Sequence, residues 1–208
     1  IEFTSYGEVV LAPQMADQAH PAFSNLFVET EILPAQHAII ATRRPRSEHE
    51  KPPWLCHMLI VHGDVLCTTS YETDRARFIG RTRTAAAPAA MTEAGKLSNT
   101  DGAVLDPIVA IRTRITLEAG ASVSMDLITG VSETRSHCLE LIERYRDRRL
   151  ANRVFGLAWT HNQVLLRQLN ASEADTQLYS QLASSVIYNN PTLRAAPDVL
   201  MSNRRGQS

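Results

Sequence analysis

Apolar and polar residues alternate over much of the chain between residues 5 and 129. The clearest stretch runs from Val109 to Leu117, where the odd-numbered positions are apolar or threonine and where Arg112 and Arg114 stand between them. Alternation with a period of two is typical of a β-strand with one face in a core and the other in water. Similar patterns predict strands at residues 5–12, 26–33, 38–42, 55–62, 65–71 and 122–129.

Two neighbouring strands are predicted to form a hairpin. Residues 55–62 and 65–71 are joined by Gly63-Asp64, a Gly-X pair that favours a tight two-residue turn. In that register Cys56 would face Tyr71 and not Cys67, so a disulfide across the hairpin is disfavoured. The chain has three cysteines, an odd number, which favours free thiols in a reducing compartment.

Near Ser132 the hydrophobic period changes from 2 to about 3.6, which predicts helices for the remainder of the chain. A weak capping box, Ser172 with Asp175, marks the start of one helix, and Asn189-Asn-Pro191 ends it. The three predicted apolar stripes are Cys138, Leu141, Ile142 and Tyr145; Val154, Leu157, Ala158, His161 and Leu165; and Leu178, Leu182, Ala183 and Val186.

Strands followed by helices predict two segregated parts and exclude a βαβ repeat. We expect a mainly β, antiparallel sandwich over residues 1–132 and a helical segment over residues 133–208. Between them, residues 85–107 show no periodicity and read as a long loop, which in a compact domain is usually functional or poorly ordered.

Charge and hydropathy exclude several functions. The formal net charge is −1, and the basic clusters around Arg43 and Arg204 are too short to follow a phosphate backbone, so no nucleic-acid partner is expected. No apolar run approaches 18 residues, so neither a transmembrane helix nor direct membrane contact is predicted. Because the chain starts at Ile1 and not at Met, we expect a piece of a longer protein.

The segment Glu72–Thr84 is rich in side chains that could bind a ligand. It holds two acids, four arginines, one phenylalanine and one glycine, directly after a predicted strand. Arginines on one segment suit planar contacts to carboxylate, phosphate or sugar hydroxyl groups. The same residues also fit a salt-bridged surface turn without a ligand, and residue types alone leave both readings open.

Other catalytic patterns are weak. His57 and His62 are an odd number of residues apart on one strand and point to opposite faces, so no metal site is predicted. There is no Gly-x-Ser-x-Gly, Gly-x-Gly-x-x-Gly or phosphate-binding loop motif. Acid pairs such as Glu29 with Glu31 read as solvated strand faces, and the tryptophans, Trp54 and Trp159, read as packing residues.

Several segments together resemble one enzyme family. They are Ser5–Ala12, Ala19–Glu31, Glu72–Arg81, Leu97–Ile108, Phe155–Asn170 and Asn203–Ser208. They resemble the inverting β-glycoside phosphorylases, a group that includes cellobiose and chitobiose phosphorylases and was formerly classed with the glycosyltransferases. Within it they are similar to the phosphorylase-like region of cyclic β-1,2-glucan synthases.

The resemblance implies a fold and also where the catalytic residues would lie. Residues 1–132 would be the latter part of a β-supersandwich, and residues 133–208 would be linker helices that lead to an (α/α)6 catalytic barrel absent from this sequence. The family's aspartate general acid would lie in that barrel. We therefore expect no catalytic residue here, an inactive fragment, no metal or organic cofactor, and inorganic phosphate as co-substrate of the parent enzyme.

The resemblance also implies a site. In a homodimer the sandwich would reach the partner's active-site entrance with Phe78 and Arg81 on an acceptor sugar and Arg75 nearby, while Glu72 and Asp74 orient the arginines. If the segment is extended, Phe78 and Arg81 face opposite ways, and a bend at Gly80 is needed to bring both to one ligand.

Two functions remain open at this point. The first is a non-catalytic region of an enzyme of β-1,2-glucan synthesis or phosphorolysis, on the cytoplasmic side of an inner-membrane parent. Its partners would be an oligosaccharide, the catalytic barrel and a second copy of the chain. The second is a stand-alone carbohydrate-binding or purely structural sandwich.

Overall fold

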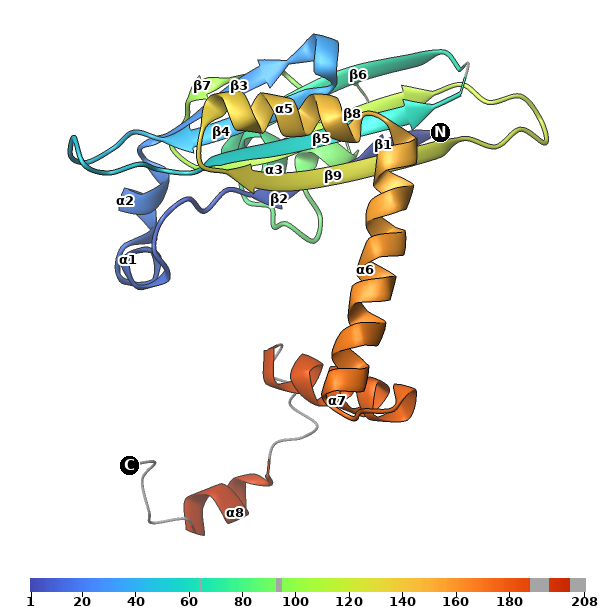
Figure 1. Cartoon of the computed structure of the whole chain (residues 1–208). Coiled ribbons are helices and arrows are strands. Elements are labelled where there is room, and N and C mark those ends of the chain that lie inside the picture. The colour runs from blue at the N-terminus through green and yellow to red at the C-terminus, as the bar shows by residue number, and fades with distance from the viewer. Residues whose placement is uncertain (64, 93–94, 188–194, 203–208) are drawn as a thin grey trace. The chain divides into compact units, whose positions relative to one another are not determined.

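The structure is a computed structural model that describes all residues except 64, 93–94, 188–194 and 203–208 (Figure 1). The chain divides into two compact units, Ile1–Leu150 and Ala151–Ser208, and each is described separately. The change from strands to helices falls after Ser132, as the periodicity predicts. The first unit nevertheless extends to Leu150, because the first long helix packs on the strands.

The first unit contains two antiparallel sheets. In the four-stranded sheet, the long strand β8 pairs with β6 and also with the short strands β1 and β2. These strands are β1 (Glu2–Thr4), β2 (Gly7–Glu8), β6 (Cys67–Asp74) and β8 (Pro107–Ile115). The five-stranded sheet has the order β7-β3-β4-β5-β9, made of β3 (Val28–Leu33), β4 (Ala38–Arg43), β5 (Trp54–His62), β7 (Gly102–Ala103) and β9 (Ser124–Ser132).

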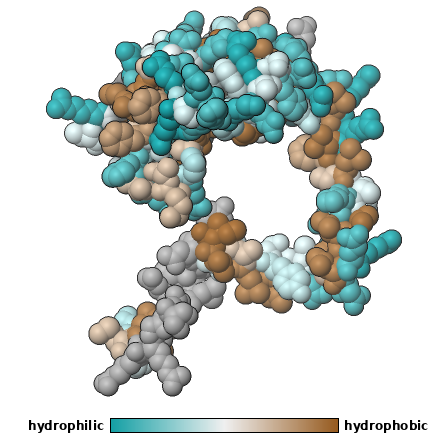
Figure 2. Space-filling model, turned by 60° about the vertical axis from the view of Figure 1, so that its left-hand side comes forward, coloured by the Kyte–Doolittle hydropathy of each residue, from teal (hydrophilic) through white to brown (hydrophobic). Residues whose placement is uncertain are grey.

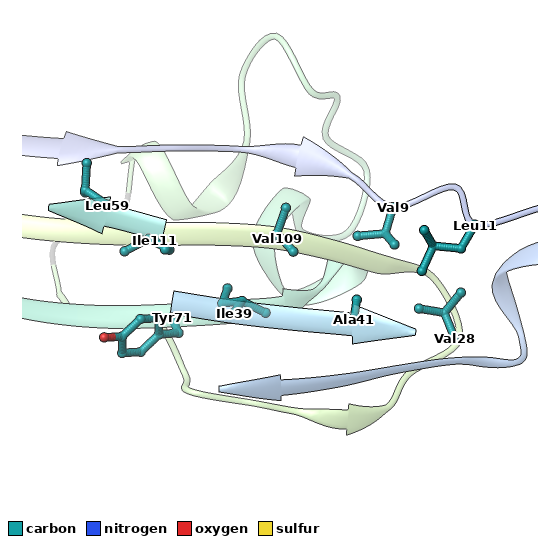
Figure 3. Packing of buried hydrophobic residues seen from close by; sticks show 9 residues of the cluster. All are labelled: Val9, Leu11, Val28, Ile39, Ala41, Leu59, Tyr71, Val109 and Ile111. Carbon is teal, nitrogen blue, oxygen red and sulfur yellow. The ribbon is translucent and has the colours of Figure 1, made fainter. Parts of the chain in front are cut away.

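The two sheets face each other across an apolar core (Figure 3). Ile39 and Leu59 come from the five-stranded sheet, whereas Tyr71 and Ile111 come from the four-stranded sheet. Alternation along each strand places these residues on the inner face, as a period of two requires. The full cluster is Val9, Leu11, Val28, Ile39, Ala41, Leu59, Tyr71, Val109 and Ile111.

The outer face of the five-stranded sheet is also covered, and the expectation of sheets with one wet side is wrong there. Helix α5 (Arg135–Tyr145) lies along β5 and β9 (Figure 1) and inserts Cys138 and Ile142 against Ile40 and Met58. The side chain of Thr134 caps this helix by accepting a hydrogen bond from the His137 amide. The predicted stripe is therefore confirmed, and it explains why both faces of β4 are apolar.

The predicted hairpin is wrong. β5 pairs with β4 and β9, β6 pairs with β8, and the chain passes from one sheet to the other between them. Cys56 lies opposite Ile40 and Gly130 instead of Tyr71. Asp64 of the predicted turn lies outside the described residues. All three cysteines are free, and Cys56 and Cys138 are buried in the same apolar cluster.

The remaining short elements connect the strands. The predicted loop 85–107 contains the helical turn α4 and the strand β7, so it is more ordered than its composition suggests. The connecting elements are α1 (Gln14–Ala19), α2 (Pro21–Asn25), the 3-10 turn η1 (Pro34–Gln36), α3 (Arg75–Ile79) and α4 (Ala89–Thr92).

The second unit is helical. It comprises most of α6 (Arg148–Gln168), together with α7 (Glu173–Ile187) and α8 (Pro197–Ser202). The capping box is confirmed: the Ser172 hydroxyl accepts a hydrogen bond from the Asp175 amide, and the Asp175 carboxylate accepts one from the Ser172 amide. The predicted stop at residues 189–191 lies outside the described residues. Within the described part of the chain, no helix is long and apolar enough to cross a membrane.

Candidate functional site

The segment after β6 forms a short helix, α3, instead of continuing as a strand. Asp74 caps it, since its Oδ1 accepts a hydrogen bond from the Ala76 amide at 2.9 Å. The Asp74 carboxylate also lies 3.6 Å from Nε of Arg77. Asp74 therefore acts on its own helix, and no contact to Arg75 or Arg81 through its side chain is found among the described residues.

Phe78 is a buried anchor of α3. Its side chain is 3% exposed, and its ring centroid lies 4.9 Å from that of Tyr6. The ring packs with Ile79, Leu97 and Ile108 on the outer face of the four-stranded sheet. A sugar ring cannot reach either face of Phe78 in this arrangement, which corrects the expectation that it stacks on an acceptor.

Gly80 bends the chain after α3, as predicted. Its φ is +83°, and a Cβ at this position would lie 2.6 Å from Cβ of Ala89. Only glycine satisfies both the left-handed conformation and the close approach of α4. The bend separates the two predicted sugar contacts, because Phe78 is inside the domain and Arg81 is exposed.

Arg81 stands on the exposed turn that follows the bend. Within the described residues its side chain makes no hydrogen bond and no ion pair, although Arg83 nearby donates a hydrogen bond to the hydroxyl of Thr92 at 2.6 Å. Thr82, also on the turn, has φ +63°. The structure thus presents the Arg81 guanidinium on a short connection that is fixed at both ends.

Arg75 is engaged by acids other than the predicted ones. Its Nε donates to Glu8 Oε1 at 3.1 Å, and its Nη1 lies 3.5 Å from Asp106 Oδ2. Glu8 also accepts a hydrogen bond from the Tyr6 hydroxyl at 2.9 Å. These two donors, Tyr6 first and Arg75 second, lower the pKa of Glu8. The predicted orientation of Arg75 by Glu72 and Asp74 is therefore wrong.

Glu72 has a different position from the one expected for a partner of arginine. Its side chain is 2% exposed, on the outer face of the four-stranded sheet opposite Ala110. Oε1 accepts hydrogen bonds from the amides of Thr73 and Asp74, both at 3.1 Å, and Oε2 accepts one from the Ser98 hydroxyl at 2.6 Å. A buried carboxylate is thus held by three neutral donors.

A cleft of about 280 Å³ lies beside Glu72. Its floor includes Arg112, which is 3% exposed and donates through Nη1 to the Gly95 carbonyl at 3.1 Å. The Nε of Arg112 lies 3.2 Å from Glu2 Oε1. The residues that line the cleft include Glu72, Arg77, Lys96, Leu97, Ser98 and Arg112.

Sequence reasoning missed Lys96, Ser98 and Arg112. Arg112 sits on the polar side of an alternating strand, which normally faces water, and Lys96 and Ser98 belong to a segment without periodicity. The strand pairing is the signal that brings them together: Ser70 lies opposite Arg112, and its hydroxyl accepts a hydrogen bond from the Leu97 amide. That pairing is not readable from a single sequence.

Comparison with known proteins agrees with this architecture. Residues 1–148 match the family model described as glycosyl hydrolase 94, supersandwich domain. This chain belongs to glycosyl hydrolase family 94. It is also 35% identical, over all 208 residues, to the cyclic beta-(1,2)-glucan synthase NdvB of Rhizobium meliloti (strain 1021), of whose length it spans 7%. The expected antiparallel supersandwich with helices after it is confirmed.

Elsewhere in this family 94 supersandwich, His57 and His62 make structural contacts. His57 is buried, with Nε2 2.9 Å from the Ser5 hydroxyl and Nδ1 2.8 Å from that of Thr129. Burial lowers the pKa of His57 to about 4, so its ring is neutral near pH 7. His62 bonds Asp126 at 2.6 Å. No group of three metal-ligating side chains is found in the described part of the chain.

Trp54 and the acid pair of β3 belong to the five-stranded sheet and do not line the cleft. Arg135 sits 6.0 Å from the ring centroid of Trp54 on the outer face of the five-stranded sheet, and it also donates to both Glu31 oxygens. Glu29 pairs with Arg44 at 3.0 Å. These acids therefore form surface ion pairs, in agreement with their reading as solvated strand residues.

Proposed function

We propose that this chain is a non-catalytic sandwich and linker region of an enzyme that synthesises or phosphorolyses β-1,2-linked glucose chains. Membership of glycosyl hydrolase family 94 and the similarity to a cyclic β-(1,2)-glucan synthase support this assignment. The chain spans only 7% of that relative, which leaves room for a catalytic domain elsewhere in such an enzyme. Its proposed location is the cytoplasmic side of an inner-membrane parent.

The exposed turn at Arg81 is the observation that carries the finer proposal. Its guanidinium has no partner among the described residues, whereas Arg75 and Arg83 are engaged within the domain. The buried ring of Phe78 on one side and Gly80 against Ala89 hold the turn in place. Such support reduces the entropy lost when a side chain binds a ligand. We assign Arg81 the acceptor-sugar contact, with Phe78 as its anchor.

The acids of this chain support a non-catalytic role. Inverting phosphorolysis uses one carboxylic acid to protonate the leaving oxygen, while phosphate is the nucleophile. Glu72 is held by three donors and Asp74 caps α3, so both acids of the arginine segment have structural contacts. In this proposal the proton donor belongs to another domain.

The helical unit supplies the proposed contacts to partners. α6 exposes Phe155 and Trp159, which are 74% and 68% exposed. Large apolar side chains along one surface mark an interaction site. We assign this surface to the (α/α)6 barrel of the same enzyme, and we assign the sandwich to the entrance of the partner's site in a homodimer.

Replacement of Arg81 tests the assignment. In the enzyme that carries this chain, Arg81→Ala should raise the KM for a β-1,2-glucooligosaccharide acceptor about tenfold, because one charged hydrogen bond contributes on the order of 1.5 kcal/mol. Arg81→Lys should retain part of the effect. Arg46, exposed on a different loop, provides the matched Arg46→Ala control. An unchanged KM and kcat in Arg81→Ala would contradict the role.

A further inference from the structure

The cleft beside Glu72 contains charged groups that the proposed acceptor contact does not use. It lies on the outer face of the four-stranded sheet, near α4, and Arg81 does not line it. Its volume of about 280 Å³ is just below the usual range for ligand pockets, which begins near 300 Å³. A ligand here would have the size of a single ring.

The Glu72 carboxylate can accept one more hydrogen bond, from a group in the cleft. An ionised carboxylate has about four lone-pair directions, and the amides of Thr73 and Asp74 and the hydroxyl of Ser98 occupy three. Glu72 forms no ion pair with any described residue, although it is 2% exposed. A buried charge without a counter-ion is costly unless polar groups complete its shell. A hydroxyl donor in the cleft would complete it.

Donors stand around this acceptor. Lys96 is exposed and makes no hydrogen bond or ion pair with the described residues, and Arg77 has a side chain that is 60% exposed and 3.6 Å from Asp74. Arg112 is already committed to the Ala90 and Gly95 carbonyls and forms part of the floor. Leu97 adds an apolar wall. The lining therefore combines one acceptor, two available cationic donors and a small apolar surface.

This combination selects a neutral polyhydroxylated ring. Its hydroxyl groups donate to Glu72 and accept from Lys96 and Arg77, while its C–H face meets Leu97. An inorganic anion would face the negative charge of Glu72, and an apolar ligand would leave that charge without a donor. We infer that the cleft binds one glucosyl residue of a β-1,2-glucan chain, as a site separate from Arg81. The choice of glucose rests on the proposed function.

Titration of the 208-residue chain with sophorose, the β-1,2-linked glucose disaccharide, tests the inference by calorimetry. We expect saturable binding that weakens about tenfold in Lys96→Ala, because one charge-assisted hydrogen bond is lost. Glu72→Gln should abolish binding, with circular dichroism as the check on folding. Should Glu72→Gln fail to fold, the exposed position of Lys96 still leaves the test decisive. Lys51→Ala, at an exposed lysine that does not line the cleft, is the matched control and should bind like the parent chain.

Each other result overturns the inference. Absence of binding in the parent chain, equal binding by Lys96→Ala, or an equal loss in Lys51→Ala would each overturn it. Inorganic phosphate is the second arm of the titration, and its competition with sophorose would identify an anion site instead. None of these outcomes concerns acceptor KM, so the proposed role of Arg81 in the enzyme succeeds or fails separately.

Discussion

The sandwich unit and the helical unit place their apolar residues in opposite environments. Ile39 and Ile111 are completely buried between two sheets, whereas Phe155 and Trp159 of α6 lie mostly in water. Figure 2 shows hydrophobic residues on the surface of the helical unit. None of the described residues of α6, α7 and α8 is buried. Helices gain most of their stability by packing an apolar face. The first unit thus contains its own source of stability, and the second has its packing surface still exposed.

Truncation of apolar side chains in the two units should give the largest difference. Ile39→Ala removes a fully buried side chain from the sandwich core and should lower the free energy of unfolding by about 3 kcal/mol. Trp159→Ala removes a larger but exposed side chain and should change it by less than about 0.5 kcal/mol. Urea denaturation monitored by circular dichroism measures both. Equal losses in the two variants would show that α6 is packed in solution.

Acid should destabilise the sandwich unit through His57. The folded pKa of His57, about 4, is below the ordinary value of 6.5 for histidine, so the unfolded chain binds the proton more tightly. Stability from this group is complete above pH 6.5 and is lost as the pH falls toward 4. The loss is on the order of 3 kcal/mol, because each pKa unit corresponds to about 1.4 kcal/mol.

The measurement is the free energy of unfolding at pH 7 and at pH 4, in the parent chain and in His57→Gln. The variant should lose less stability between the two pH values, whatever its stability at pH 7. His161→Gln is the matched control on α6, where the histidine is exposed, and its pH dependence should equal that of the parent. A pH dependence unaltered by His57→Gln would contradict the prediction.

The same glycine substitution should have opposite signs in the two units. Gly80→Ala introduces a Cβ 2.6 Å from that of Ala89 at φ +83° and should destabilise the sandwich unit by about 2 kcal/mol. Gly156 lies within α6 with open space at its Cβ, so Gly156→Ala should stabilise that helix by about 0.8 kcal/mol.

Substitution of Gly120 separates the cost of the positive φ at Gly80 from the cost of the close contact with Ala89. It has φ +79° and open space around its Cβ, so Gly120→Ala carries only the conformational cost, about 1 kcal/mol. Thermal unfolding by circular dichroism gives all three values. If Gly80→Ala costs no more than Gly120→Ala, the close approach of α4 is not a constraint.

Patterns within one element were predictable from the sequence, and contacts between distant elements were not. The alternation around Ile111 and the stripe through Cys138 and Ile142 predicted a strand and a helix that the structure contains. The hairpin after His62 was wrong because a Gly-X turn is a local signal, whereas β5 pairs along its whole length with residues 124–132. Pairing of β5 with β9, which follows about seventy residues later in the sequence, outweighed the local preference for a turn.

The arginine segment also shows that contacts between distant elements could not be predicted from the sequence. Four arginines close together suggested one ligand, yet Arg75 is taken up by Glu8 and Asp106, and only Arg81 is left without a described partner. The burial of Phe78 depends on Tyr6 and Leu97, which are far from it in sequence. The arginine-rich segment contributes Glu72 and Arg77 to the lining of the cleft, but tertiary packing sets how deeply each side chain is buried.

The order of strands has a consequence for synthesis of the protein. β1, β2 and β6 all pair with β8, and β5 pairs with β9 on one edge. These early strands therefore cannot complete their pairing until a later strand has been synthesised. Until residue 132 has left the ribosome, β5 keeps an unpaired edge rich in apolar residues, and such edges promote aggregation. Nascent chains that stall before β9 should therefore need chaperones, whereas those that extend into α5 can close both sheets.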